Sequence, residues 1–254
     1  VGHGARTLSN GGNMTVYSQL SLADRQSSIY SPDPSNVVAT LTVLDGASLT
    51  AYAISIGNGS GGSMTGIVTQ TGGRVRTTGS TGDPTHFPEE YDGLHLGHYP
   101  AAYSEWNMCG GELIVDNGDR WAIAIDGRGV LRQTGGEIYA NEIVVNARSG
   151  GGGYGRLTLE GGVMNIGSNG ITAGTGAPYL VEYGGGTVRA TTNFASQLNA
   201  TLTGTGAGSV TFDTKEWSIA LSGKLTGDGG LSKSGTGTLT LSGTNTYAGA
   251  TRVM

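Results

Sequence analysis

A pair of adjacent glycines recurs along this chain at nearly constant spacing, and this spacing restricts the fold more than any other feature. Four of these pairs begin at Gly110, Gly135, Gly161 and Gly184. An earlier pair begins at Gly72, which leaves a clearly longer step before Gly110. A repeat of about 25 residues indicates one small structural unit that stacks on its neighbours.

Each unit also contains short runs of alternating apolar residues, which are typical of β-strands. Such runs stand at 54–56, 94–96, 123–125 and 143–145. A unit of three short strands has too little apolar surface to form a core alone, so we expect stacked units to share one. In each Gly-Gly pair we expect a glycine with positive φ at a corner of the stack, because glycine adopts that conformation without strain.

These features predict an all-β fold, a parallel β-solenoid of about nine to ten coils of roughly 25 residues. A β-propeller is disfavoured because one blade needs roughly 40–50 residues. A β-sandwich gives no reason for a repeated Gly-Gly pair at constant spacing.

Composition excludes several other classes of protein. Glycine supplies 48 of the 254 residues, and each glycine costs a helix about 1 kcal/mol relative to alanine, so a mainly helical fold is excluded. Collagen is excluded because there is no strict Gly-X-Y period and only 6 prolines. The apolar runs are too short to span a membrane. A net charge of -5 offers no basic surface, so we expect no nucleic-acid partner. The single cysteine, Cys109, permits no internal disulfide.

The long step between Gly72 and Gly110 predicts an inserted loop at about 76–108. This segment is rich in aromatic and acidic residues, which suit glycan binding because aromatic rings stack on sugars. The glycan-binding candidates are Glu89, Glu90, Tyr91, Tyr99, Tyr103 and Trp106. We expect Tyr91, Tyr99 or Trp106 to be exposed. The alternative is that this loop only covers one face of the solenoid.

The sequence supplies no complete set of catalytic or metal-binding residues. His95 falls in an alternating run and is expected to face outward, whereas His98 follows a glycine, and no third ligand is evident beside them. Paired carboxylates such as Glu89 and Glu90 could act as acid and base in glycoside cleavage, but no lysine lies nearby and only Arg74 and Arg76 are close in the sequence. We therefore assign no catalytic residue, no metal site and no cofactor.

A more specific pattern occupies the C-terminal end. Residues 227–253 read GDGGLSKSGTGTLTLSGTNTYAGATRV. This segment resembles the autotransporter-associated β-strand repeat, in which Lys233, Asn245 and Tyr247 stand at fixed places between glycines. The alternation predicts that Leu239 points inward and Thr240 outward. We expect Asn245 to bond the backbone of its own turn, and Tyr247 to pack against a neighbouring coil.

The resemblance implies a right-handed parallel β-helix in an exported bacterial surface protein, extracellular or attached to the cell surface. We therefore expect a non-enzymatic structural or adhesive element, which would also be able to assemble end to end into a fibre. The alternative is a β-helix protein that binds or cleaves polysaccharide, a lyase or a glycoside hydrolase. The expected partners are other segments of a longer chain, copies of itself, or glycans.

The expected organisation along the chain has three parts. Residues 1–40 form an irregular cap or the first coils, residues 41–220 form the solenoid, and residues 221–254 continue it as the C-terminal repeat. An open last coil would present unpaired N–H and C=O groups. We therefore expect its strands to be covered, by further coils or by the first coil of another copy. This segment is not expected to insert into a membrane.

Overall fold

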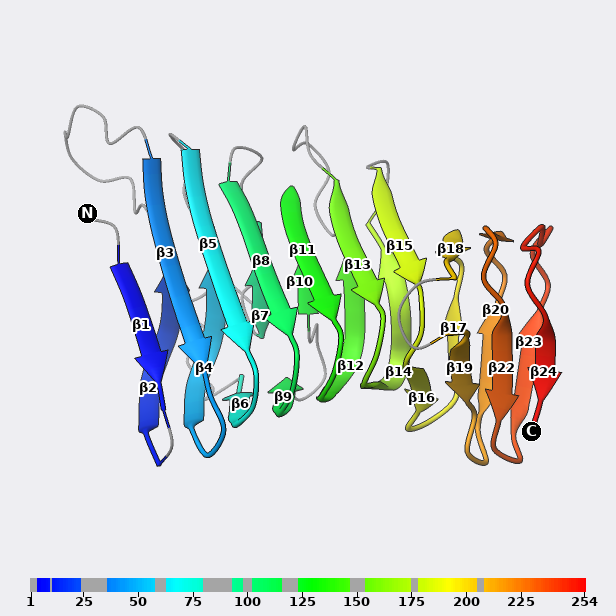
Figure 1. The fold of residues 1–254 in the computed structure, drawn as a ribbon, viewed down its shortest axis with the longest axis horizontal. Helices are drawn as coiled ribbons and strands as arrows, with labels where there is room; N and C mark the ends of the chain where they lie inside the picture. Colours follow the sequence, from blue (N-terminus) through cyan, green and yellow to red (C-terminus); the bar gives the residue numbers. More distant parts are fainter. Residues whose placement is uncertain are drawn as a thin grey trace.

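The computed structural model describes residues 4–9, 11–23, 36–57, 63–79, 93–97, 102–115, 123–146, 154–174, 178–204 and 208–254. Over these residues the protein consists of β-strands and turns, without a helix. The strands are stacked along one long axis, with β1 and β24 at its opposite ends (Figure 1). The predicted all-β class is confirmed.

The strands form three sheets. Sheet 1 is nine-stranded, sheet 2 is twelve-stranded and sheet 3 is three-stranded. Sheet 1 contains β1 (Gly4–Leu8), β3 (Asn36–Val43), β5 (Ser63–Gln70), β8 (Ala102–Met108), β11 (Arg128–Gln133), β13 (Gly155–Leu159), β15 (Tyr179–Tyr183), β18 (Ala200–Leu202) and β21 (Leu225–Thr226).

Sheets 2 and 3 complete the cross-section. Sheet 2 contains β2 (Asn13–Leu22), β4 (Ser48–Ile56), β6 (Arg74–Thr77), β7 (Leu94–Leu96), β9 (Glu112–Val115), β10 (Ile123–Ile125), β12 (Glu137–Val145), β14 (Val163–Ala173), β16 (Thr187–Ala190), β19 (Val210–Asp213), β22 (Leu231–Ser234) and β24 (Thr251–Val253). Sheet 3 contains β17 (Phe194–Ser196), β20 (Ser218–Leu221) and β23 (Thr238–Leu241).

Every strand pair that the structure describes is parallel. Strand partners in the middle of the chain are separated by one repeat, as Tyr103 is from its partner Arg128. Near the C-terminus the repeat becomes shorter, and Leu231 pairs with Thr251. Parallel pairing one repeat apart is the arrangement of a β-solenoid, in which each coil lies on the one before it.

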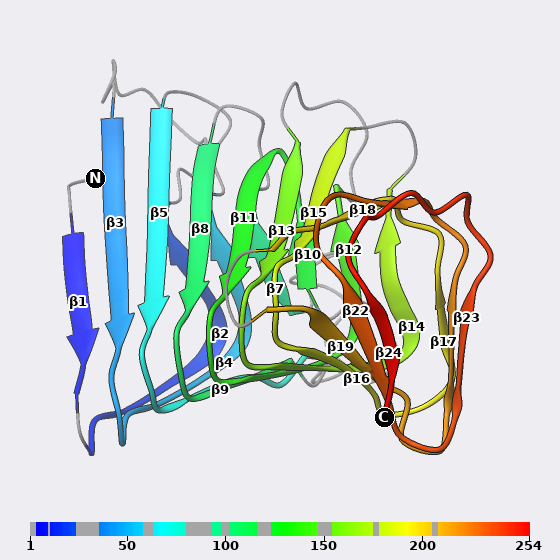
Figure 2. The same ribbon diagram turned by 45° about the vertical axis from the view of Figure 1, so that its right-hand side comes forward.

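Within one coil the chain passes along sheet 1, turns at the Gly-Gly corner, and then runs along two further sides. In some coils these two sides are one long bent strand. The bend in β12 coincides with a register shift between Ala140 and Glu142, which is a β-bulge. In the C-terminal coils separate strands replace it, and the backbone there encloses a roughly triangular cross-section (Figure 2).

The core consists of columns of inward-pointing side chains, one from each coil. Paired residues along sheet 1 form one column, with an exposed fraction of at most 4%: Leu41, Val68, Trp106, Leu131, Leu157 and Val181. Sheet 2 contributes a second column, exposed by at most 1%: Leu49, Val75, Leu113, Ile138, Met164, Val188 and Phe212. Fully burying one such side chain stabilises the fold by roughly 1.5–3 kcal/mol, so these columns hold the coils together.

The expectation of an inserted loop at about 76–108 is wrong for β7 and β8, because both are strands of the stacked coils. β7 pairs with β4 and β10 in sheet 2, and β8 pairs with β5 and β11 in sheet 1. Alternating side chains from Ala102 to Met108 point into the core, which makes β8 an ordinary strand of the coil. Residues 80–92 and 98–101 lie outside the described residues.

Candidate functional site

The Gly-Gly corners are the most regular feature of the stack. The second glycine of each pair has positive φ, with values of 65° at Gly73, 75° at Gly111, 70° at Gly136, 76° at Gly162 and 69° at the third glycine of the last group, Gly186. The predicted positive φ at these corners is therefore confirmed.

The first glycine of each pair is required for a different reason, which is the close approach of the coil below. A Cβ at Gly110 would lie 2.3 Å from the carbonyl oxygen of Thr71, and one at Gly135 would lie 2.3 Å from that of Cys109. Gly161 meets Thr134 at the same distance. These contacts are with backbone, which has little freedom to move aside. The first glycine thus allows close stacking. The second allows both the turn and close stacking, because a Cβ at Gly136 would lie 2.6 Å from the carbonyl oxygen of Gly111.

Two buried glutamines brace these corners from inside. Gln70 and Gln133 are fully buried at the last inward position of β5 and β11. Nε2 of Gln70 donates to the carbonyl of Glu112 at 2.9 Å. Nε2 of Gln133 donates to the carbonyls of Gly136 at 3.0 Å and Val163 at 3.1 Å. The bonds of Gln70 to Glu112 and of Gln133 to Val163 each connect one coil to the next inside the core.

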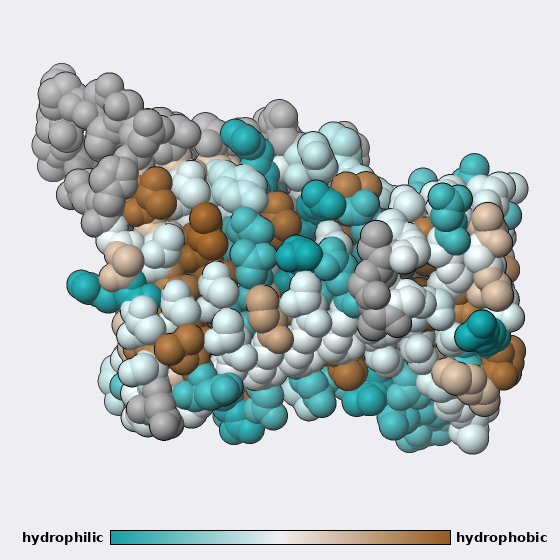
Figure 3. Space-filling model, in the orientation of Figure 1, coloured by the Kyte–Doolittle hydropathy of each residue, from teal (hydrophilic) through white to brown (hydrophobic). Residues whose placement is uncertain are grey.

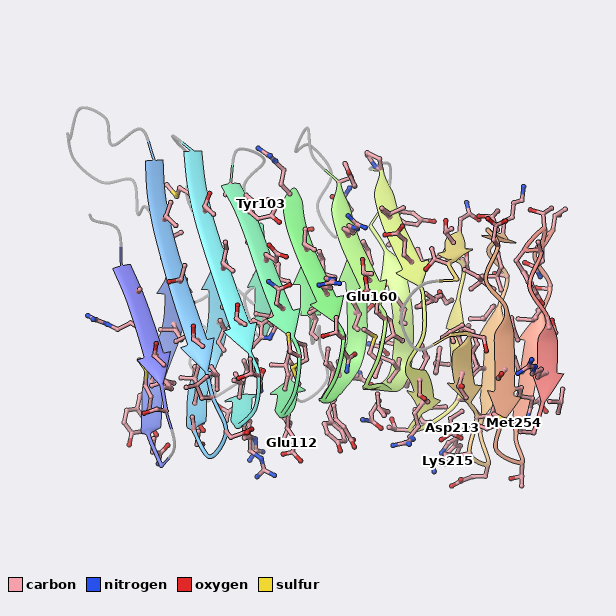
Figure 4. All side chains as sticks on the ribbon, in the orientation of Figure 1. Tyr103, Glu112, Glu160, Asp213, Lys215 and Met254 are labelled. Atoms are coloured by element: carbon pink, nitrogen blue, oxygen red, sulfur yellow. The ribbon has the colours of Figure 1, made fainter. Side chains whose placement is uncertain are left out.

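Ion pairs between neighbouring coils cross the outer face of sheet 1. Arg132 of β11 pairs with Glu160 at 2.6 Å, and Arg156 of β13 pairs with Glu182 of β15 at 2.5 Å. The arginine side chains are 47% and 43% exposed, so each pair contributes less than about 1 kcal/mol to stability. Figure 4 shows Glu160 on this face and Tyr103 near its upper edge.

A second polar network crosses the outer face of sheet 2 over four coils. Tyr139 donates to Glu137, and Asn165 of the next coil also donates to Glu137. Arg189 donates to Asn165 and to Asp213. We call these five residues the sheet 2 ladder. Figure 4 shows Asp213 beside Lys215, whose Nζ lies 3.5 Å from the Asp213 carboxylate.

The hydrogen bonds of the sheet 2 ladder shift the pKa values of its acidic groups. The bond from Tyr139 lowers the pKa of Glu137, and the same bond raises the pKa of the Tyr139 hydroxyl. At Asp213, desolvation acts to raise the pKa, but bonds from the Arg189 side chain and the Lys215 backbone lower it overall. The charged form of both carboxyl groups is thus favoured by the fold.

The structure places two of the glycan-binding candidates. The hydroxyl of Tyr103 donates to Glu105 at 2.9 Å, and the guanidinium of Arg128 lies 6.0 Å from the centre of its ring. Burial, followed by the bond to Glu105, raises the pKa of Tyr103 to about 12. Glu89, Glu90, Tyr91 and Tyr99 lie outside the described residues.

The expectation that Trp106 is exposed is wrong. Its side chain is fully buried and lies in the sheet 1 column between Val68 and Leu131. The alternation of β8 explains this, because Trp106 shares its inward face with Ala102 and Met108. A residue inside the column has no surface to offer a glycan.

His95 is buried as well, with 3% of its surface exposed, although we expected it to face outward. It lies on β7 between Ser55 of β4 and Ala124 of β10. His98 lies outside the described residues. Where side chains are described, no group of three or more His, Cys, Asp or Glu residues is placed to hold a metal ion.

The C-terminal repeat forms the last coils with the same alternation of side chains and the same parallel pairing as the rest of the chain. Leu239 and Leu241 alternate with the exposed Thr238 and Thr240, as predicted. Tyr247 packs against the core, also as predicted. Asn245, however, accepts a hydrogen bond from the backbone N–H of Leu225 at 2.9 Å, so it bridges two coils rather than bonding its own turn through that side chain.

The lysine of the repeat also has a structural position. Lys233 is the strand partner of Phe212, which is the last residue of the sheet 2 column. Its Nζ donates to the carbonyl of Gly235 at 2.7 Å, in the corner that follows β22. Sequence reasoning did not assign this role, nor that of Gln70 and Gln133. A long polar side chain at an inward position just before a glycine corner is the signal common to all three.

The last coil is open on its outer side. Leu239 and Leu241 are only partly buried, and Val253 and Met254 are 76% and 70% exposed. Among the described residues, β23 pairs only with β20 and β24 only with β22. Met254 lies at the extreme end of the long axis (Figure 4).

Comparison with known proteins supports the resemblance in this C-terminal part. Residues 231–254 match the family model of the passenger-associated-transport-repeat. The chain therefore carries an autotransporter-associated repeat in its last coils. Comparison with curated proteins and with solved structures finds no match. In the described part of the chain, no helix is long and apolar enough to cross a membrane.

Proposed function

We propose that this protein is a non-enzymatic structural and adhesive element of an exported bacterial surface protein. The observation that carries this proposal is the match of residues 231–254 to a repeat associated with passenger transport. Stacked corners, buried columns and polar ladders between coils support a role as a stiff rod. We further propose that the rod is a right-handed β-helix of nine to ten coils.

The one acidic residue of the 76–108 segment that the structure describes does not by itself support the enzymatic alternative. Glu105, the acidic residue of the 76–108 segment that the structure describes, accepts a hydrogen bond from Tyr103. That bond lies on the outer face of sheet 1, and Arg128 stacks over the same tyrosine ring. This arrangement is a self-contained polar contact, whereas glycoside cleavage requires a pair of carboxyl groups that face each other across the substrate.

We also propose that the last coil is covered by a further coil of the same kind. Its partly buried leucines and unpaired strand edges form a surface that matches the face of another coil, because every coil below uses the same pairing. Burying Leu239 and Leu241 completely would stabilise the rod by roughly 1–3 kcal/mol. Further repeats, or a second copy of this chain, would supply that coil.

Appending a second copy of residues 235–254 after Met254 keeps the 20-residue repeat of the last coils and tests this proposal. The expected result is a higher free energy of unfolding in urea, because the added strands pair with β23 and β24. A scrambled insert of the same composition serves as the control and should add nothing. Equal stability of the two extended proteins would contradict the proposed stacking. Sedimentation of the original chain at increasing concentration then shows whether copies stack on one another.

A further inference from the structure

Sheet 1 contains a groove where the strands of the sheet change length, and the buried Val181 and Ala200 form part of its lining. β15 has five residues, whereas β18 and β21 have three and two. Figure 1 shows this change between the labels β15 and β18. A cavity of about 350 Å³ opens to the surface here, lined among others by Pro178, Tyr179, Leu180, Asn199, Thr201 and Thr226. We call it the β15 groove.

One wall of the β15 groove is a stretch of backbone that has no strand partner among the described residues. Pairing between β15 and β18 is confined to Glu182 with Thr201 and Tyr183 with Leu202. The first part of β15, from Tyr179 to Val181, pairs with β13 on its other side. In the described part of the chain, no strand covers its edge toward the groove. That edge offers both N–H donors and C=O acceptors to a ligand.

The same wall is held in place at two points. The Asn146 side chain, itself 1% exposed, donates a hydrogen bond to the carbonyl of Pro178. The backbone N–H of Asn199 donates to the hydroxyl of Tyr179 at 3.0 Å, so the tyrosine ring spans from β15 toward β18. A ring fixed in this way loses little conformational entropy when a ligand packs against it.

The chemistry of the lining is neutral and amphipathic. Tyr179 and Leu180 supply apolar surface, and Thr201 and Thr226 supply hydroxyl groups. No charged side chain lines the groove among the described residues. Glu182, the neighbour of this lining along β15, is already paired with Arg156. A neutral ligand with a flat apolar face and many hydroxyls therefore fits better than an anion or a cation.

We propose that the β15 groove binds a neutral saccharide. One sugar ring packs against Tyr179, which lines the inner side of the groove against the core, while its hydroxyls exchange hydrogen bonds with Thr201, Thr226 and the part of the β15 edge that no described strand pairs. Figure 3 shows that this face of the molecule is mainly neutral to hydrophilic, with scattered apolar residues.

This inference does not rest on the proposed stacking of the last coil. The groove is formed by β15, β18 and β21, whereas the open end is formed by β23 and β24. Variants of the groove leave the open end unchanged, so the two proposals fail or succeed separately.

Titration of the isotope-labelled protein with maltohexaose, cellohexaose and xylohexaose, followed by amide NMR shifts, tests the groove. The expected result is a saturable shift of the Asn199, Thr201 and Thr226 amides with at least one of these sugars, and none with oligogalacturonate. Tyr179→Ala should weaken binding at least about 10-fold. Thr201→Trp should do the same by filling the groove while keeping the bond between Tyr179 and Asn199.

Matched controls separate the groove from general effects. Tyr139→Ala removes a hydrogen-bonded tyrosine from sheet 2, and Thr211→Trp makes the same enlargement there; both should leave saccharide affinity unchanged. The proposal is overturned if no groove amide shifts with any neutral sugar at about 10 mM, well above the Kd of a millimolar site. Preferential binding of oligogalacturonate, or equal loss of binding in the sheet 2 controls, would also overturn it.

Discussion

Arg189 of β16 and Asp213 of β19 face each other on neighbouring strands, with Nε of the arginine 3.0 Å from the aspartate carboxylate. Their side chains are 31% and 12% exposed, so the pair is shielded more than the ion pairs on sheet 1. It joins two coils at a place where the column beneath is already filled by Val188 and Phe212. The pair therefore adds a polar contact between coils to an apolar one.

The lowered pKa of Asp213 predicts a pH dependence of stability. A carboxyl whose pKa is lower in the folded state stabilises the fold fully above its unfolded pKa, about 3.9, and loses that contribution as the pH falls through its folded pKa. We expect Asp213→Asn to remove this part of the acid sensitivity. Urea unfolding between neutral pH and pH values below about 3.9 measures it. An identical acid profile for the variant and the original protein would contradict the assignment.

Both glycines of a corner are predicted to resist substitution. Gly136→Ala places a side chain at positive φ, which costs roughly 1–2 kcal/mol of backbone strain, and its Cβ would also lie 2.6 Å from the Gly111 carbonyl oxygen. Gly135→Ala has no such strain but should also destabilise the fold, because its Cβ meets the Cys109 carbonyl. Gly204→Ala is the control, since a Cβ there has nothing within 4 Å. Thermal unfolding of the three variants checks this, and a control as unstable as the two corner variants would refute it.

Trp106 is predicted to act only through stability. Trp106→Ala leaves a cavity in the sheet 1 column and should cost about 3–5 kcal/mol. Trp106→Phe keeps most of the volume and should cost less. Denaturant unfolding measures both variants, and saccharide titration of any variant that folds should give an unchanged Kd. Weaker saccharide binding by a folded Trp106→Phe variant would contradict this prediction and indicate that Trp106 contributes to the ligand site.

Asn245 is predicted to link two coils. Asn245→Ala removes the acceptor for the Leu225 N–H and should cost roughly 1–3 kcal/mol. The exposed neighbour Thr244 provides the control, and Thr244→Ala should change stability by less than about 0.5 kcal/mol. Hydrogen exchange of the Leu225 amide gives a direct reading, because this amide should exchange faster only in the Asn245 variant. Unchanged exchange there would contradict the bridge.

The sequence was sufficient to predict the corners and the alternating strands. The spacing of the Gly-Gly pairs that begin at Gly110, Gly135 and Gly161 predicts the corners directly, because only glycine tolerates both the positive φ of the second position and the close backbone contacts. The alternation of Leu239 and Leu241 likewise predicted which side faces inward. Both signals are local in the chain, and each is repeated or sustained over several residues.

The errors arose where one repeat is unusually long. The long step from Gly72 to Gly110 suggested a loop, and the aromatic residues in it were interpreted as ligand-binding, although Ala102 to Met108 alternate like any other strand. The β15 groove was not foreseeable, because it depends on where β18 starts relative to β15. The side-chain oxygen of Asn245 could accept a hydrogen bond from its own turn or from the neighbouring coil. Only the position of the neighbouring coil, which places the Leu225 N–H within reach, distinguishes the two.

The column arrangement has a consequence for how such a chain can change in length. Each inward residue contacts the equivalent residue one coil away, so Ile138 is held between Leu113 and Met164, and these two are similar in size and apolar character. Removing one complete turn of the chain would bring Leu113 and Met164 together and preserve every column. Removing half a turn would bring outward residues into the core. A rod of this kind can therefore be lengthened or shortened during evolution, but only in whole steps.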